Sequence, residues 1–115
     1  MADIREWRGH HVVDEKGHRI GTLESVYVET STDEPFFATV TVGVMGRRRL
    51  AFVPLEGAVV GPDYVRVAYP KSKVSKAPAI GTDDILPATD EPEVFAYYEL
   101  PYAPGASGER RLARR

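Results

Sequence analysis

The chain has 115 residues, of which 43% are hydrophobic and 28% are charged, a composition typical of one globular domain. It contains no cysteine, which excludes disulfides, thiolate nucleophiles and thiolate metal sites. Its net charge of −2 gives no overall reason to expect a nucleic-acid or membrane partner.

Residues 1–9 form a charged N-terminal arm without the apolar stretch of a secretory signal. No apolar run in the rest of the chain approaches the roughly 20 residues of a membrane-spanning helix. We therefore expect a cytoplasmic protein without a membrane span.

Turn residues recur about every ten positions and separate short segments rich in valine, threonine, tyrosine and phenylalanine. This pattern is typical of a small antiparallel barrel or sandwich. Gly21 lies where the apolar spacing of the second segment changes parity, which predicts a bulge or a sharp bend. We predict six strands, at about residues 11–14, 18–30, 36–44, 50–54, 58–60 and 64–69.

The third predicted strand has the most regular alternation in the chain. The period of two predicts that one set of side chains faces the core while Phe37, Thr39, Thr41 and Gly43 face outward. The inward set is Phe36, Ala38, Val40, Val42 and Val44. The fourth strand is apolar on both faces, so we expect another element to cover its outer side.

One short helix is predicted at about residues 90–100, after an irregular connector at residues 71–87. Asp90 and Glu93 have the spacing of a capping box, and Val94, Phe95 and Tyr98 form an apolar stripe. A helix this short is unstable alone and must dock on the barrel or on a partner. The domain thus covers residues 10–102.

Residues 103–115 contain too few apolar side chains to order themselves, so we predict a disordered basic tail. From residue 105 onward, four arginines and one glutamate give this tail a net charge of +3. The rest of the chain therefore carries a net charge of −5.

The order of these elements resembles the PRC-barrel family, named after the photosynthetic reaction centre. The likeness runs from about His11 to Tyr102. It is carried by VVDEKGHRIGTL at 12–23, VYVE at 26–29, RLAFVPL at 49–55, Ala77-Pro78, and the acidic, aromatic segment 91–100. The resemblance implies a small, strongly bent, six-stranded antiparallel β-barrel with one short C-terminal helix. It also implies a non-catalytic role, as in the reaction-centre H subunit and a ribosome maturation factor. In this sequence we expect neither the membrane anchor of the first nor the RNA-related domain of the second, so neither specific role is carried over.

No catalytic or cofactor-binding constellation appears among the chemically capable residues. His10 and His11 are neighbours on a strand and point to opposite faces, and with His18 they make a poor zinc site, so we expect no metal. The glycines form no phosphate-binding loop. The candidate acids lie in turn-like or alternating polar contexts and are not paired: Asp14, Glu24, Glu29, Glu56, Asp83 and Asp84. We therefore expect a protein that is not an enzyme and needs no cofactor.

Arg47, Arg48 and Arg49 allow two interpretations. Three guanidinium groups at the mouth of a hairpin can hold a carboxylate or a phosphate through paired hydrogen bonds. Alternatively, they protect the apolar strand that follows from pairing at its edge, which is common in β proteins. We favour the second interpretation because the wider charge is negative.

Tyr97 and Tyr102 also leave two interpretations open. Their segment either closes one end of the barrel or presents an outward tyrosine to a partner, since tyrosine is enriched in protein interfaces. Self-association through exposed edges or exchange of the C-terminal helix is the simplest interface.

Two functions follow from the sequence. The first is a non-enzymatic protein-interaction or assembly module that forms a homodimer and binds a protein of unknown identity. The alternative is an accessory nucleic-acid or ribosome-associated protein that uses Arg47, Arg48, Arg49 and the basic tail.

Overall fold

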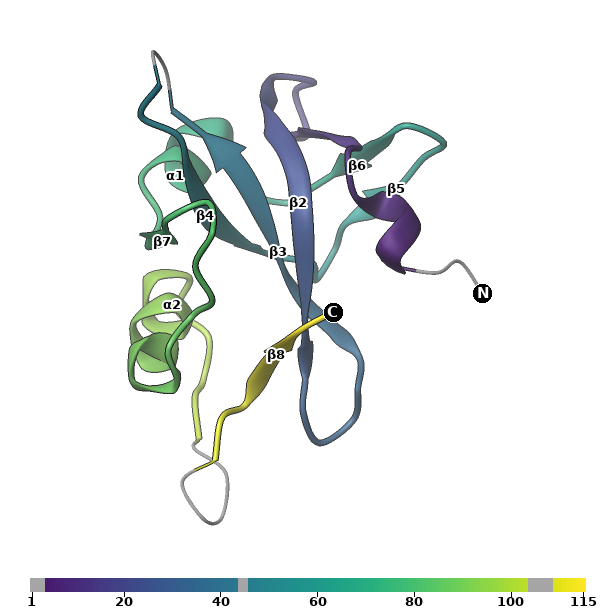
Figure 1. Ribbon diagram of the computed structural model, residues 1–115. Coiled ribbons are helices and arrows are strands. Elements are labelled where there is room, and N and C mark those ends of the chain that lie inside the picture. Colours follow the sequence, from purple (N-terminus) through teal and green to yellow (C-terminus); the bar gives the residue numbers. More distant parts are fainter. Residues whose placement is uncertain (1–3, 44–45, 104–108) are drawn as a thin grey trace.

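The computed structural model describes residues 4–43, 46–103 and 109–115 as a bent sheet with short helices packed on it (Figure 1). The helices are α1 (Lys71–Ser75) and α2 (Glu91–Tyr97), with 3-10 turns η1 (Ile4–Trp7) and η2 (Ala88–Asp90). The strands are β1 (His11–Val13), β2 (Arg19–Glu29), β3 (Pro35–Val42), β4 (Arg49–Pro54), β5 (Val59–Val60), β6 (Tyr64–Arg66), β7 (Ala79–Ile80) and β8 (Leu112–Arg114). None of the helices in these described ranges is both long and apolar enough to cross a membrane.

The sheet is open, with the strand order β5-β6-β1-β2-β3-β4-β7 and with β8 paired to β2. Strands β1 and β6 run parallel, whereas the other neighbouring pairs run antiparallel. The six predicted strands are confirmed, but the prediction of a closed, purely antiparallel six-stranded barrel is wrong. The difference from the prediction has a physical cause in β2. Strand β1 pairs only with the first residues of this long strand, so the edge at residues 27–29 is left open and β8 pairs there.

Gly21 lies at an irregularity of the β1–β2 ladder, so the predicted bulge is confirmed. Val12 pairs with Gly21 and Val13 pairs with Arg19, which leaves one extra residue in β2. A Cβ atom at Gly21 would lie 2.0 Å from the carbonyl oxygen of Thr41 on β3. Glycine is therefore required here for the close approach of two backbones.

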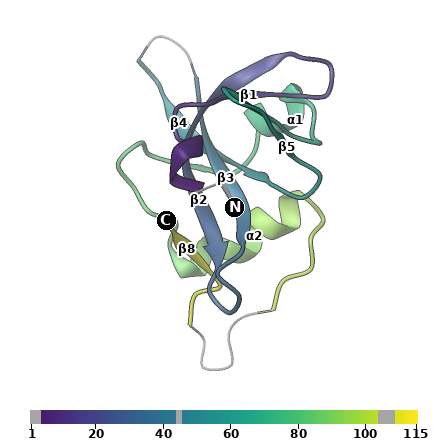
Figure 2. The same ribbon diagram turned by 90° about the vertical axis from the view of Figure 1, so that its right-hand side faces the viewer.

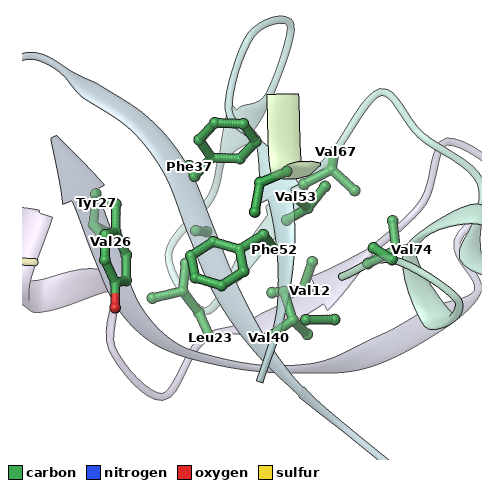
Figure 3. Packing of buried hydrophobic residues seen from close by; sticks show 14 of the residues in the cluster. Val12, Leu23, Val26, Tyr27, Phe37, Val40, Phe52, Val53, Val67 and Val74 are labelled. Carbon is green, nitrogen blue, oxygen red and sulfur yellow. The ribbon is translucent and has the colours of Figure 1, made fainter. Parts of the chain in front are cut away.

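The core fills the bend of the sheet, where Leu23, Val40 and Phe52 pack together (Figure 3). On β3 the predicted inward residues Ala38, Val40 and Val42 are buried and the predicted outward Gly43 is exposed. The prediction is wrong for Phe36, which is only half-buried, and for the outward face at Phe37 and Thr39, which are fully buried. Helix α2 covers this face, and the ring centroids of Phe37 and Phe95 are 5.3 Å apart. The predicted inward residue Val44 lies outside the described residues.

Helix α2 covers the sheet as its apolar stripe predicts, although it ends three residues earlier than expected. Val94, Phe95 and Tyr98 are buried, and the Tyr98 hydroxyl donates a 2.6 Å hydrogen bond to the carbonyl of Phe52 on β4. The predicted cover over β4 is confirmed. The stretch 71–87 is less irregular than predicted, since it contains α1 and β7.

The prediction of a disordered tail is wrong for residues 109–115. Strand β8 pairs with Tyr27, Val28 and Glu29 of β2, and Leu112 is buried. Residues 104–108 lie outside the described part of the chain. The C-terminal strand thus runs beside β2 and near the N-terminal turn η1 (Figures 1 and 2).

Candidate functional site

The three consecutive arginines before β4 have different environments. The Arg49 guanidinium donates to the carbonyls of Ser75 and Ala77, so it fixes the end of α1. Arg47 and Arg48 are exposed. Strand β4 lies between β3 and β7, so it is not a free edge and the edge-protection interpretation is wrong.

Arg48 lines a surface hollow of about 460 Å³. A second hollow, of about 590 Å³, has four lining residues in common with the first: Glu24, Leu50, Thr82 and Asp83. The two hollows therefore adjoin at these four residues, and we call them together the arginine groove. Its cationic lining residues come from the N-terminal turn, the β3–β4 connection and β8: Arg5, Arg8, Arg48, Arg114 and Arg115.

Ion pairs already occupy part of the arginine groove. The Arg8 guanidinium lies 2.8 Å from the carboxylate of Glu24, and the Arg115 guanidinium lies 3.1 Å from that of Asp33. Arg48 and Arg114 are exposed and form no ion pair or side-chain hydrogen bond with the rest of the described chain. These two guanidinium groups are therefore available to an anionic partner.

A buried carboxylate attaches β8 to the domain. Glu91, on the first turn of α2, is completely buried and accepts hydrogen bonds from the amides of Arg111 (3.0 and 3.1 Å) and Leu112 (3.0 Å). It also accepts one from the Tyr102 hydroxyl at 2.8 Å. We call this cluster the Glu91 clamp.

The side chain of Arg111 adds a second attachment. It donates to Glu29 at 2.5 Å and to the carbonyl of Ala103 at 2.7 Å. The Ser31 hydroxyl, together with Arg111, stabilises the Glu29 carboxylate and holds its pKa below the usual value despite burial. Arg111, predicted as part of a partner-binding tail, thus holds the C-terminal segment against the domain.

Both candidate interface tyrosines use their hydroxyls inside the chain. Tyr97 is half-buried, donates a 2.6 Å hydrogen bond to the carbonyl of Lys73, and lies under the Lys73 ammonium at 4.8 Å. Tyr102 is half-buried, donates to Glu91 and packs its ring 4.9 Å from that of Phe95. Their suggested contact with a partner stays a prediction.

A third hollow, of about 580 Å³, lies beside the β1–β2 turn and includes Asp14. Asp14 is buried and accepts hydrogen bonds from the amides of Lys16, His18 and Lys71. Burial raises the pKa of this carboxyl, but the amides and the adjacent His18 outweigh that effect and hold the pKa below its usual value. Through these hydrogen bonds the Asp14 carboxylate connects the β1–β2 turn to the start of α1, so its role is structural.

Within residues 4–43, 46–103 and 109–115, no three histidine or carboxylate side chains gather as metal ligands would. His18 instead lies against Asp14, with 3.3 Å between its Nδ1 and the carboxylate.

A comparison with protein-family models matches residues 1–74 to the PRC-barrel domain. The chain belongs to the PRC-barrel family. This confirms the resemblance for the part that ends within α1, which includes all six strands predicted from the sequence. The PRC-barrel match does not extend over α2 and β8, which hold the Glu91 clamp. A comparison with curated proteins finds no match.

The arginine groove was only partly predictable. Sequence reasoning singled out Arg48, Arg114 and Arg115 as separate basic segments, but it missed Arg5 and Arg8. The N-terminal arm gives no charge signal for them, because Asp3 and Glu6 balance Arg5 and Arg8 in the sequence. The sequence places Glu91 only in the acidic first turn of the helix. Its contacts with Arg111 and Leu112, about twenty residues further along the chain, produce no local sequence pattern.

Proposed function

We propose that this PRC-barrel protein is a non-enzymatic interaction module of the cytoplasm that binds other proteins and forms a homodimer. The observation that carries this proposal is the end strand of the open sheet. Strand β5 pairs only with β6, and its side chains Val59 and Val60 are 44% and 39% exposed. Exposed valines on an unpaired edge favour addition of another strand.

A second copy supplies a strand of matching chemistry, because antiparallel pairing of β5 with its own copy around a two-fold axis is self-complementary. The buried carboxylates support the non-enzymatic part of the proposal. Asp14 and Glu91 accept hydrogen bonds from backbone amides, so both serve the fold.

Light scattering tests the dimer. We expect a dimer mass for the wild-type chain at tens of micromolar and a monomer mass for the variant Val59→Lys. The matched control is Ile85→Lys, because Ile85 is 47% exposed but lies outside the strands. A wild-type monomer, or equal effects of the two variants, would overturn the β5 dimer.

Nucleic-acid binding is the second candidate, and one observation favours it. Arg48 and Arg114 line the two adjoining hollows of the arginine groove, although they are far apart in sequence. Deleting residues 105–115 would remove β8, so single charge reversals at Arg48 and Arg114 are the better test. Binding to single-stranded DNA or RNA that weakens with salt and with both reversals would support this function.

A further inference from the structure

We propose that the arginine groove binds an extended, acidic segment of a partner protein, with Arg48 and Arg114 as the main carboxylate-binding residues. This inference rests on the proposed protein-binding function and names the chemistry of the partner. Unlike the β5 edge, it concerns a second surface with polar rather than apolar recognition.

The charge of the groove carries the first step. Five arginines line it against two carboxylates, Glu24 and Asp83, although the whole chain has a net charge of −2. A local excess of positive charge on an acidic protein attracts an anionic segment selectively. Arginine presents planar donors that match a carboxylate in two parallel hydrogen bonds.

The arginines of the groove differ in whether they already form an ion pair. Arg8 and Arg115 are ion-paired with Glu24 and Asp33, respectively. Arg48 and Arg114 are exposed and have no such partner in the described chain, so they bind a carboxylate without breaking an existing contact. Their location in two adjoining hollows suits an extended peptide with more than one acidic residue.

The lining of the groove favours a peptide over a nucleic acid. Its two hollows contain no aromatic side chain among their described lining residues, and base stacking needs such a side chain. Glu24 and Asp83 also line both hollows, and they would repel a phosphate backbone, which carries negative charge at every nucleotide. A peptide can place its carboxylates beside the arginines and neutral residues beside these two acids.

Fluorescence anisotropy with a labelled peptide of alternating glutamate and serine tests the inference on the full chain. At low salt we expect saturable binding that weakens as salt increases. The charge reversals Arg48→Glu and Arg114→Glu should each weaken binding about tenfold, the effect of losing one charge-assisted contact. The matched control is Arg66→Glu, because Arg66 is exposed on β6 and does not line the groove.

Several results would overturn the inference. These are no binding at millimolar protein, equal binding of a lysine–serine peptide, or an equal loss in the Arg66 variant. Tighter binding of a single-stranded oligonucleotide that both groove reversals abolish would reassign the groove to nucleic acid. Light scattering of the same variants tests β5 separately, since a groove reversal should leave the mass unchanged. If the protein is a monomer and still binds the acidic peptide, the dimer is refuted but the proposal that the arginine groove binds an acidic segment stands.

Discussion

Replacing Glu91 by glutamine should release β8 from the domain while the rest of the sheet stays folded. The wild-type carboxylate accepts hydrogen bonds from the amides of Arg111 and Leu112 and from the Tyr102 hydroxyl. Glutamine has nearly the same shape but is neutral, and its amide nitrogen is a donor that cannot accept these bonds. The substitution therefore weakens several contacts and leaves a buried donor facing other donors.

The magnitude follows from the two backbone contacts. A hydrogen bond to a charged group contributes about 1.5–3 kcal/mol, so weakening two of them should cost about 3 kcal/mol. Every 1.4 kcal/mol is a tenfold change in an equilibrium constant, so the population of detached β8 should rise about 100-fold.

Amide hydrogen exchange followed by NMR measures this release directly. The amides of Arg111 and Leu112 should exchange about 100-fold faster in Glu91→Gln. The Thr30 amide should follow them because it donates to the carbonyl of Arg111 in the attached state. Amides between β3 and β4 should change much less, since β8 does not pair with those strands.

Glu93→Gln is the matched control, because Glu93 lies on the same helix but is exposed. Its exchange rates should equal those of the wild type. Unchanged exchange at Arg111 and Leu112 in Glu91→Gln would refute the clamp. Equal acceleration of every amide would refute separate release of β8 and indicate that the whole domain unfolds as one unit.

Three further predictions concern stability. Leu112→Ala should lower the free energy of unfolding by about 2–5 kcal/mol in urea titrations, because Leu112 is fully packed; a loss below 1 kcal/mol would contradict the packing of β8. Gly21→Ala should lower the melting temperature much more than Gly17→Ala, since only the first Cβ collides with backbone, whereas Gly17 has open space and a φ of 82°. Hydrogen bonds from a serine and an arginine lower the folded-state pKa of Glu29, so its contribution to stability is present above the ordinary pKa of 4.5 and is lost as pH falls from there through the lower folded-state pKa. Glu29→Gln should therefore show a smaller difference between its neutral and acidic urea midpoints than wild type, and an equal difference would refute this role.

The strands β1 to β6 could be predicted because their signals are local. Alternating apolar residues and turn residues depend only on neighbours in the chain, and the parity change at Gly21 marked the bulge for the same reason. The face assignment of β3 failed where a distant element intervened. Alternation alone cannot show that α2 packs on this face at Phe37, or that Thr39 is buried.

Strand β8 and the Glu91 clamp could not be predicted for a related reason. The segment after residue 108 has one large apolar side chain, Leu112, which is too little for a strand signal. Its stability comes from a carboxylate on α2 and from the open edge of β2. Both are long-range partners, and an acidic first turn of a helix is ordinarily explained by the helix dipole alone.

The structure also changes the meaning of the uneven charge distribution. The net charge of +3 in residues 105–115 indicated a solvated basic tail, whose arginines would act as independent charges. Attachment of β8 instead gives these arginines separate roles, because Arg111 binds Glu29 while Arg114 remains exposed at the groove. Arg5 of the N-terminal turn η1 and Arg8 line the same hollow as Arg114 and Arg115, so segments from both ends of the chain form this part of the groove. The Glu91 clamp therefore helps to keep Arg114 and Arg115 in the groove, since detached β8 would leave Arg48 without these two arginines nearby.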